Sequence, residues 1–364
     1  MTKVVAFYLP QFHQIPENDK WWGEGFTEWT NVKKAKPLFN GHNQPRIPLN
    51  NNYYDLSSAK TLEWQASLMN NYGIDGMCFY HYWFGGKTLL EKPLENLLEN
   101  PSINMPFCLA WANEPWTRAW DGGDKEVIME QHYGSQSDWE AHFDYLYNAF
   151  KDIRYLTYEG KPIFIIYRAQ SIPDLEKMLI FWQELAKNKG LSGIHFVRMN
   201  TGFSNEQCGL SGITAQLDFE PMYSLTHSLK LVSRIRRFLR KRFRIFLNLF
   251  LERKLPIDVV DYQAIWDQIL ARDITGNTYP GAFVGWDNTP RKGSRGLIVK
   301  GSSAGNFRKN FTIQYNRCVE SNAEFIFINA WNEWAEGTYL EPDIENQYEY
   351  LEVIRNVKAD NDIN

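Results

Sequence analysis

Two glutamates near the C-terminal end of the chain have the type and spacing of an acid/base pair. Glu333 and Glu336 follow an apolar run, residues 324–330, that has the length of a buried β-strand. Cleavage of a glycosidic bond needs one carboxyl group to protonate the leaving oxygen and a second to act as base or nucleophile. Side chains on which sugars can pack or hydrogen-bond surround the pair: Trp331, Asn332 and Trp334. The motif predicts a catalytic pair in an aromatic-walled pocket. The alternative is a strand that ends in a solvated loop.

Length and composition indicate one large catalytic domain that spans residues 1–364. Barrels of the (β/α)8 type fold as single units of roughly 200 to over 400 residues, and this chain has 364 residues. Aromatic residues make up 15% of the chain, including 14 Trp, which is more than a core needs. The excess favours a carbohydrate or aromatic ligand. The net charge of −4 argues against nucleic acid as a partner.

Strand-like apolar runs alternate along the chain with segments of helical periodicity. This alternation is typical of βα units around a parallel sheet. We therefore predict an α/β fold of the (β/α)8 TIM-barrel type with long βα loops. The expected strands are residues 4–9, 76–80, 106–111, 163–167, 194–199, 213–217, 282–286 and 324–330.

Polar and aromatic residues follow these expected strands, at the ends where barrel enzymes carry their catalytic groups. Turn-forming residues alone would not explain repeated Glu, Arg, His and Trp at these positions. Glu114 lies in a Trp-x-Asn-Glu order that resembles the last-strand motif, so it is a rival for a catalytic role; the alternative is a rim ion pair with Arg118. The candidate substrate-binding residues are His81, Tyr82, Trp83, Trp111, Asn113, Glu114, Arg168, Asn200, Glu220, Trp331, Asn332 and Trp334.

The connection between the first strand and the first helix is longer than 40 residues. Connections of this length in compact domains are usually functional loops. Trp22 and Trp29 in this segment, together with Trp21, are predicted either to wall a sugar subsite or to anchor the loop on the barrel rim. Glu28 is expected either to bind sugar hydroxyls or to be a solvated loop acid.

The order of motifs along nearly the whole chain resembles the WbsX-like family, which is found with bacterial polysaccharide biosynthesis and is related to glycoside hydrolase family 99. The motifs that carry the resemblance are residues 7–13, 21–31, 76–84, 111–114 and 331–337. The resemblance implies a (β/α)8 barrel and a retaining, endo-acting glycosidase or transglycosylase on a surface polysaccharide such as O-antigen or its lipid-linked precursor.

The resemblance also implies separate roles for the two acids of the Glu-x-x-Glu pair. Glu333 matches the carboxylate that acts as base on the sugar 2-hydroxyl, which gives an anhydro-sugar intermediate. Glu336 matches the general acid/base. Ala335 departs from the family 99 pattern, which usually has His at this position, and this departure bears on mannose specificity more than on the pair itself.

Burial gives an independent expectation for the protonation of the pair. Two carboxyl groups three residues apart, screened by Trp331 and Trp334, should not both ionise easily. The more buried group should hold its proton near neutral pH and act as the acid. The sequence does not say which of the two this is.

Residues 228–254 form a basic segment within the expected barrel. The segment contains ten Lys or Arg and one acid. Apolar residues recur among the cations at helical spacing, which is typical of an amphipathic helix on anionic lipid. The prediction is peripheral contact with an anionic membrane; the alternative is an insertion that packs on an acidic surface of the same protein.

A glycosyltransferase that uses a nucleotide sugar is the alternative to a glycosidase, and a carbohydrate-binding barrel without catalysis is a third possibility. The one Asp-x-Asp sequence, residues 360–362, lies in a polar C-terminal tail. We expect no cofactor and no metal site.

The cellular location follows from the cysteines and the N-terminus. Cys78, Cys108, Cys208 and Cys318 are far apart without metal-ligand spacing, which favours reduced thiols. The N-terminal residues predict a first strand rather than a signal peptide. We expect a cytoplasmic protein that is peripheral to the inner membrane.

Overall fold

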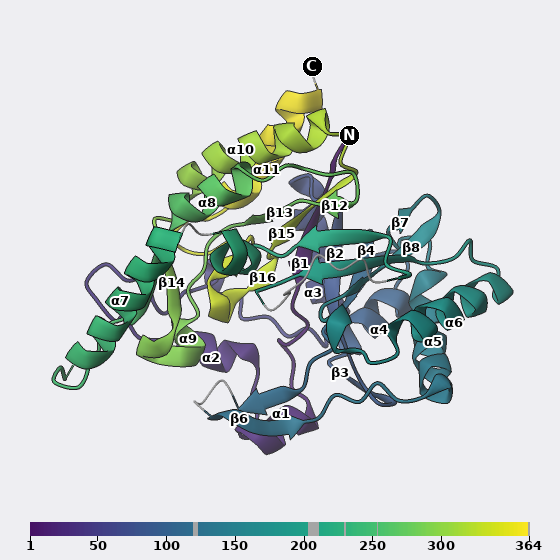
Figure 1. Ribbon diagram of the computed structural model, residues 1–364, viewed down its shortest axis with the longest axis horizontal. Helices are drawn as coiled ribbons and strands as arrows, with labels where there is room; N and C mark the ends of the chain where they lie inside the picture. Colours follow the sequence, from purple (N-terminus) through teal and green to yellow (C-terminus); the bar gives the residue numbers. More distant parts are fainter. Residues whose placement is uncertain (119–122, 203–210, 229–230, 253, 363–364) are drawn as a thin grey trace.

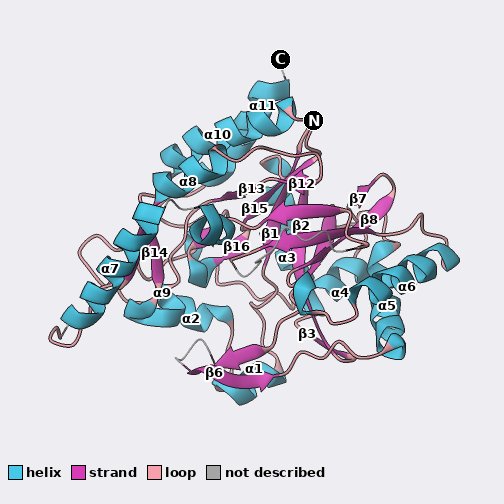
Figure 2. Ribbon diagram, in the orientation of Figure 1, coloured by secondary structure: helices cyan, strands magenta, loops and turns pink. Residues whose placement is uncertain are grey.

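The computed structural model describes residues 1–118, 123–202, 211–228, 231–252 and 254–362, and its centre is a largely parallel sheet (Figures 1 and 2). In the described part of the chain the strands of this sheet pair in the order β12, β10, β9, β8, β4, β2, β1, β15, β13. Their bounds are β1 (Lys3–Tyr8), β2 (Gly76–Phe84), β4 (Phe107–Trp111), β8 (Lys161–Ile166), β9 (His195–Asn200), β10 (Ala215–Asp218), β12 (Thr278–Tyr279), β13 (Gly281–Phe283) and β15 (Phe325–Asn329).

The sheet forms a ring that is not continuous, because its seventh barrel strand is interrupted at Pro280. The two halves of this strand are β12 and β13. β12 pairs in parallel with β10, and β13 pairs in parallel with β15. Proline has no N–H to donate to a ladder, but the Pro280 carbonyl still accepts from Phe327 N at 3.0 Å. Taken as one strand, β12 and β13 complete a ring of eight. The prediction of a (β/α)8 barrel is confirmed.

Gly281 allows the backbone of β13 to pass close to β10. A Cβ atom at this position would lie 2.0 Å from the carbonyl oxygen of Asp218. We expect Gly281→Ala to lower the free energy of unfolding by about 3 kcal/mol, because backbone atoms at the barrel seam must move apart. Urea denaturation measures the change. Gly276→Ala is the matched control, since a Cβ there meets no atom within 4 Å; equal stability of the two variants would contradict the argument.

Amphipathic helices cover the outside of the barrel. In α10 the aromatic side chains of Phe307, Phe311 and Tyr315 recur every fourth residue and are fully buried. The side chain of Ser303 caps the same helix by accepting from Asn306 N at 3.2 Å. The covering helices are α3 (Ala59–Asn71), α4 (Lys92–Glu99), α5 (Gln136–Phe150), α6 (Leu175–Asn188), α8 (Tyr262–Leu270), α10 (Ala304–Glu320) and α11 (Glu349–Asp362).

Most of the added structure lies at the C-terminal ends of the barrel strands, away from the two chain termini (Figure 1). The long connection after β1 contributes helices, and a hairpin follows β4. The prediction of long βα loops is confirmed. These elements are α1 (Pro16–Trp22), α2 (Glu28–Lys34), η1 (Leu49–Asn51), β3 (Lys87–Leu89), β5 (Trp116–Arg118), β6 (Gly123–Met129), η2 (Ala169–Ser171), η3 (Ser224–Ser228), α9 (Thr289–Lys292), η4 (Gly293–Arg295), β16 (Asn332–Glu333), η5 (Trp334–Glu336) and β17 (Thr338–Tyr339). The short strand β7 (Thr157–Tyr158) instead forms a hairpin with the start of β8.

The basic segment forms helix α7 (Leu231–Leu247), which runs along the flank of the barrel (Figure 1). A small parallel pair, β11 (Asp258–Asp261) and β14 (Leu297–Lys300), lies beside it. Among the described residues, no helix is both long and apolar enough to span a bilayer. Residues 229, 230 and 253 of the predicted segment lie outside the described part of the chain.

Three of the four cysteines are buried free thiols: Cys78, Cys108 and Cys318. Burial raises the pKa of Cys78 well above its ordinary value and that of Cys318 to about 12. These thiols are core residues of low reactivity. Cys208 lies outside the described residues.

Candidate active site

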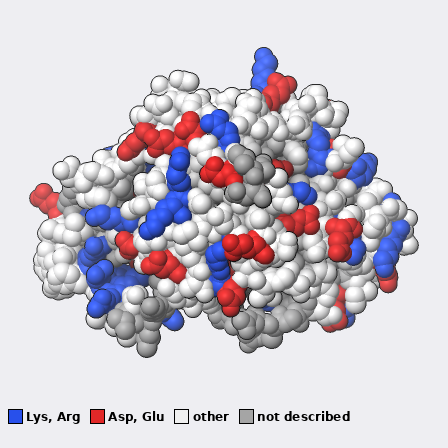
Figure 3. Space-filling model, turned by 90° about the horizontal axis from the view of Figure 1, so that it is seen from above, with Lys and Arg blue, Asp and Glu red and all other residues white. Residues whose placement is uncertain are grey.

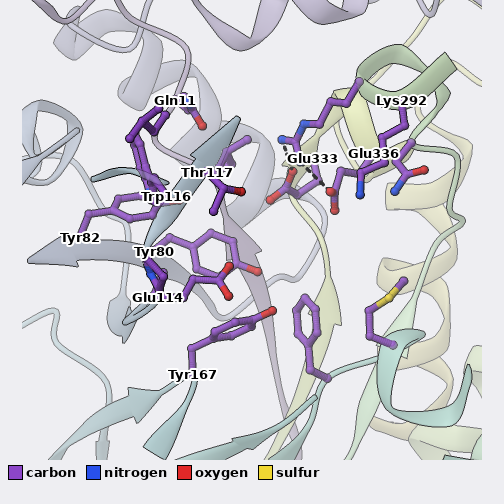
Figure 4. Close-up of a pocket in the computed structure, with 18 of the residues that line it drawn as sticks. Gln11, Tyr80, Tyr82, Glu114, Trp116, Thr117, Tyr167, Lys292, Glu333 and Glu336 are labelled. Atoms are coloured by element: carbon purple, nitrogen blue, oxygen red, sulfur yellow. Dashed lines mark hydrogen bonds and ion pairs between the residues drawn. The ribbon is translucent and has the colours of Figure 1, made fainter. Parts of the chain in front are cut away.

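A cavity of about 390 Å³ opens at the C-terminal ends of the barrel strands. Figure 4 shows Glu333 and Glu336 on one side of it, with Tyr80, Glu114 and Tyr167 facing them from the other. Its volume and partly aromatic walls are typical of a ligand-binding pocket. Its polar and aromatic lining consists of Gln11, Trp22, Tyr80, Tyr82, Glu114, Trp116, Thr117, Tyr167, Phe219, Trp286, Asn288, Arg291, Lys292, Glu333 and Glu336.

Backbone contacts on both sides fix the strand end that carries the two glutamates. Asn332 forms a double hydrogen bond with Leu9 at the end of β1: its Oδ1 accepts from Leu9 N at 2.7 Å, and its Nδ2 donates to Leu9 O at 3.0 Å. The Glu336 carbonyl accepts from Asp287 N at 2.6 Å. Gly337 turns the chain with φ 63°, and a Cβ there would lie 2.9 Å from Asp287 N. Asn332, which was predicted to bind substrate, therefore positions Glu333 and Glu336 instead.

Arg291, from α9, contacts both Glu333 and Glu336. Its Nη1 donates to Glu336 Oε1 at 2.6 Å, and its Nη2 lies 3.4 Å from Glu333 Oε2. The same guanidinium binds Glu28 through Nη2 at 2.7 Å and Nε at 3.1 Å. Glu28 is fully buried, so it is a structural ligand of Arg291 rather than a solvated loop acid.

Burial controls the protonation of the pair. The pKa of Glu333 is raised to about 8, first by burial and then by the charge of Glu336, against the opposing effect of Arg291. Burial also raises the pKa of Glu336, and the charge of Arg291 opposes this. The Glu333 side chain is 8% exposed and that of Glu336 is 20% exposed. In the free protein the proton therefore lies on Glu333, which is the reverse of the acid assignment that the resemblance implies.

The wall opposite the pair carries a second carboxyl group. Glu114 forms an ion pair with Arg168 at 2.5 Å, and burial raises the pKa of Glu114 above its ordinary value. The expected rim pair between Glu114 and Arg118 is wrong, because Arg118 instead pairs with Glu126 at 3.1 Å. Glu114 faces the cavity as a neighbour of Tyr80 and Tyr167 (Figure 4).

Side-chain alternation along β2 divides its predicted site residues between two faces. Tyr80 and Tyr82 line the cavity, so the intervening His81 and the following Trp83 point to the outside of the barrel. There His81 Nε2 lies 2.8 Å from His142 Nε2, and the Trp83 ring stacks on His142 at 4.5 Å. Burial lowers the pKa of His81 to about 3. The prediction that His81 and Trp83 bind substrate is therefore not supported by their position, whereas Tyr82 is well placed.

Several other predicted residues are part of the barrel framework rather than of the cavity lining. Trp111 packs against Trp182 at 6.4 Å, between the barrel and its helices. Asn113 is fully buried and bridges to the next strand end by accepting from Arg168 N at 2.7 Å. Asn200 donates to Asp218 Oδ1 at 2.9 Å. These positions satisfy buried polar groups locally, so substrate contact is not supported for them.

Glu220 belongs to a separate buried charge cluster. Its Oε1 accepts from Arg272 Nη1 at 3.0 Å and from Ser224 Oγ at 2.8 Å. Arg272 also donates to Asp218 Oδ2 at 2.6 Å. Because Glu220 is 1% exposed and held by these partners, its predicted role in binding substrate is not supported.

The tryptophans of the two loop motifs divide between lining and anchoring roles. Trp22 lines the cavity. Trp29 is buried against Phe12 and donates from Nε1 to Tyr54 O at 2.8 Å, so it anchors the long loop. Trp334 donates to Glu341 Oε2 at 2.7 Å. Trp331 and Trp334 are fully buried, so of the predicted indoles only Trp22 is placed to meet a sugar among the residues that the structure describes.

Sequence reasoning missed part of the cavity wall. Period-two alternation from Tyr82 would have found Tyr80, and the strand-end rule would have found Tyr167. No spacing pattern marks Arg291, because it enters the site from a helix after the seventh strand. The polar and aromatic lining residues missed in this way are Tyr80, Trp116, Thr117, Tyr167, Phe219, Trp286, Asn288, Arg291 and Lys292.

Asp287 joins the long first loop to the catalytic segment. Its Oδ2 accepts from His42 Nε2 and Gln44 Nε2, each at 2.8 Å. Burial raises the pKa of Asp287, but hydrogen bonds led by that from His42 and the charge of Arg46 outweigh this and lower the pKa to about 2. Asp287 is therefore a permanent anion that holds the loop over the site.

Comparison with known proteins assigns the family. The profile of the family described as "Glycosyltransferase WbsX" matches residues 4–354. The chain belongs to the WbsX family. Two proteins of this type, each named "Uncharacterized protein WxcX" and from two strains of Xanthomonas campestris pv. campestris, are 37% identical over 356 residues. The match covers 97% of this chain and 49% of each relative, so this WbsX chain spans about half the length of the curated relatives it matches.

Two solved structures similar to this WbsX-family chain have glycoside hydrolase names. The endo-α-mannosidase of glycoside hydrolase family 99 from Bacteroides thetaiotaomicron aligns with a TM-score of 0.55 and 14% identity, over 98% of this chain and 96% of that one. A structure described as a glycoside hydrolase-like protein aligns with a TM-score of 0.59 and 13% identity, over 98% and 93% of the two chains. At these identities the likeness shows the fold. Family and fold together support a carbohydrate-active enzyme.

Proposed function

We propose that this protein is a retaining glycosidase or transglycosylase in which Glu333 and Glu336 form the acid/base pair. The observation that carries the proposal is the buried carboxyl pair at the barrel mouth, whose pKa values are both raised and which shares one guanidinium, Arg291. Raised carboxyl pKa values allow one group to hold a proton at neutral pH while its neighbour is ionised. Acid/base cleavage of a glycosidic bond requires this charge state.

The pair holds one proton in the proposed mechanism. The resemblance implies that Glu333 removes the proton of the sugar 2-hydroxyl and that Glu336 protonates the leaving oxygen. Arg291 contacts Glu336 at 2.6 Å and Glu333 at 3.4 Å, so in the free site it favours ionised Glu336. The proton must therefore move from Glu333 to Glu336 when the glycan binds, or the two roles are exchanged.

Leaving-group dependence separates the two assignments. When the acid is replaced, the cleavage rate of aryl glycosides with a good leaving group should change little, because such groups depart without protonation. Replacing the base slows good and poor substrates alike.

We propose a bacterial surface polysaccharide such as O-antigen, or its lipid-linked precursor, as the substrate. Family membership supports this class, and the buried donors Gln11 Nε2 and Trp286 Nε1, which line the cavity without a protein acceptor among the described residues, suit sugar hydroxyls. Residues 1–364 would act as a single catalytic domain. We place the protein in the cytoplasm, at the surface of the inner membrane, where lipid-linked precursors are assembled.

A glycosyltransferase is the second candidate, and the description of the family favours it. A nucleotide-sugar enzyme often uses an Asp-x-Asp metal site after a strand. The Asp-x-Asp sequence here lies at the end of α11, beside the chain termini and away from the barrel mouth (Figure 1). No group of three or more metal-ligating side chains is found within the described ranges.

One assay separates the two candidates. The protein is incubated with the cognate repeat-unit polysaccharide, with and without added nucleotide sugars, and chain length and new reducing ends are followed by mass spectrometry. The proposal expects shortened or rearranged glycans without any nucleotide. Transfer that depends strictly on a nucleotide sugar would establish the glycosyltransferase instead.

A further inference from the structure

Helix α7 has its polar side against the protein and its apolar side outward. The side chains of Arg237, Lys241, Arg244 and Asn248 are only partly exposed and recur every three or four residues, so they form one stripe of the helix and its C-terminal turn. A surface helix of a globular protein normally packs its apolar stripe on the core. The orientation of α7 is therefore the reverse of the normal one.

Hydrogen bonds to the neighbouring segment fix this orientation. Arg237 binds Asp258 through two bonds, Nε to Oδ1 at 2.7 Å and Nη2 to Oδ2 at 2.8 Å. Further along the stripe, Arg244 Nη1 donates to Pro256 O at 3.0 Å, and Asn248 Nδ2 donates to Leu255 O at 2.8 Å. These contacts replace apolar packing on the polar side of α7. The predicted alternative was an insertion that packs on an acidic surface of the same protein. It explains the polar side of the helix but not the opposite side.

The opposite side of α7 and its C-terminal turn is apolar and exposed. The exposed fraction is 58% for Phe238, 60% for Leu239 and 56% for Phe246, and it rises to 74% for Phe250 beyond the helix. A soluble monomer does not normally expose such a contiguous aromatic and aliphatic surface, and its presence marks an interaction site. The exposed apolar residues of this surface are Ile235, Phe238, Leu239, Phe243, Ile245, Phe246, Leu249, Phe250 and Leu251.

Cations border the apolar surface. Arg234, Arg236, Arg240 and Arg242 are all exposed on α7, and the Arg242 guanidinium lies 5.5 Å from the centre of the Phe238 ring. Lys and Arg gather at the lower left of the molecule in Figure 3, the end at which Figure 1 shows α7, with a few acidic residues beside them. An apolar surface bordered by arginines matches the interface of an anionic bilayer, where rings enter the acyl boundary and guanidinium groups meet phosphates.

We propose that α7 and the turn that follows it dock this protein on an anionic phospholipid membrane. This inference rests on the proposed function and extends it. A glycan attached to a membrane lipid would reach the cavity of an enzyme that is bound to the same surface. The docking surface comprises the apolar residues 235–251 and their bordering arginines.

A short series of contacts connects α7 to the wall of the cavity. Asp258, which binds Arg237, begins β11, and β11 pairs in parallel with β14. Ile257 N donates to Ser294 O in the turn that directly follows α9, the helix that carries Arg291. Membrane contact through α7 therefore sets the position of the active site relative to the lipid surface, as an enzyme on a lipid-linked glycan requires.

Vesicle flotation tests the proposal without any glycan, so its outcome is independent of the catalytic assignment. The wild-type protein is mixed with vesicles of phosphatidylcholine that contain about 30% phosphatidylglycerol, and with vesicles of phosphatidylcholine alone. We expect flotation with the anionic vesicles and about tenfold less with the neutral ones. Absence of flotation with both, for a protein that is folded by circular dichroism, would overturn the proposal.

Two pairs of variants separate the apolar and electrostatic contributions. Phe246→Ser with Phe250→Ser removes two rings that would enter the acyl boundary and should reduce binding to anionic vesicles by about tenfold or more. Arg236→Gln with Arg240→Gln removes two cations that would meet lipid phosphates and should reduce it by about thirtyfold. All four side chains are exposed, so folding should persist. The matched controls carry the same changes elsewhere on the surface and should bind like the wild type: Ile180→Ser with Ile313→Ser, and Arg308→Gln with Lys309→Gln.

The same variants test the other occupants of this surface. If the wild type is a dimer by light scattering, fails to float, and becomes monomeric with Phe246→Ser and Phe250→Ser, a second copy of the chain covers the surface and the proposal is wrong. Equal loss of flotation in the control variants would also contradict it, because binding would then follow net charge or overall hydrophobicity rather than α7.

Discussion

Glu333→Gln should abolish glycan cleavage and at the same time make the protein more stable at alkaline pH. Removal of one acid/base group slows such reactions by about a hundredfold to ten-thousandfold. The stability of the variant should rise at alkaline pH because the folded protein raises the pKa of Glu333 to about 8, far above the ordinary value of about 4.3. The stability that this carboxyl group contributes is complete below its unfolded pKa and is lost as the pH rises through about 8.

Glutamine cannot ionise, so the variant avoids this loss. Thermal unfolding should give the variant a higher Tm than the wild type at pH above about 8 and a similar Tm below about pH 5. Glu63→Gln, at an exposed position of α3, is the control and should leave activity and Tm unchanged. A variant that keeps wild-type activity would remove Glu333 from the mechanism. A variant that is less stable than the wild type at high pH would show that folding favours the ionised carboxylate, so that the pKa of Glu333 is not raised.

Arg291→Gln should have the largest effect on folding. It leaves Glu28, Glu333 and Glu336 around a site without their shared guanidinium. Breaking a buried ion pair by removing one partner lowers the free energy of unfolding by about 3–5 kcal/mol, because the remaining charge stays buried. Glu28 is fully buried and takes two hydrogen bonds from Arg291, so most of the effect should come from this contact. Urea denaturation at neutral pH measures the loss.

A double-variant cycle tests whether the carboxylates cause the loss. Glu28→Gln combined with Arg291→Gln should recover part of the stability, since it removes the buried charge that lost its partner. Arg291→Lys keeps the charge without the planar fork and should fall between the wild type and Arg291→Gln. Arg295→Gln, at an exposed position of η4, is the control. Strictly additive effects of Glu28→Gln and Arg291→Gln would contradict this role for the guanidinium.

The barrel was predictable because its strands are buried on both faces. Such strands are continuous apolar runs, and short apolar runs separated by helical periodicity have few other solutions than a parallel sheet. The division of the seventh strand at Pro280 was not predictable in the same way, because it depends on which neighbour each half meets across the barrel seam.

Strand-end positions were a good guide to the region of the site but a poor one to individual side chains. Tyr82 and His81 are neighbours in the sequence, yet one lines the cavity and the other packs on α5. A one-residue difference reverses the face of a strand, and apolar composition on both faces gives no alternation from which to read the register.

By itself, the sequence determined the fold class, the candidate pair Glu333 and Glu336, and the basic amphipathic character of residues 228–254, since each depends on local composition and spacing. Only the tertiary structure decided what surrounds them. It brought Arg291 and Glu28, which are 263 residues apart, to one pair of acids, and it turned the apolar side of α7 outward. Both outcomes depend on contacts between distant segments, for which local spacing carries no signal.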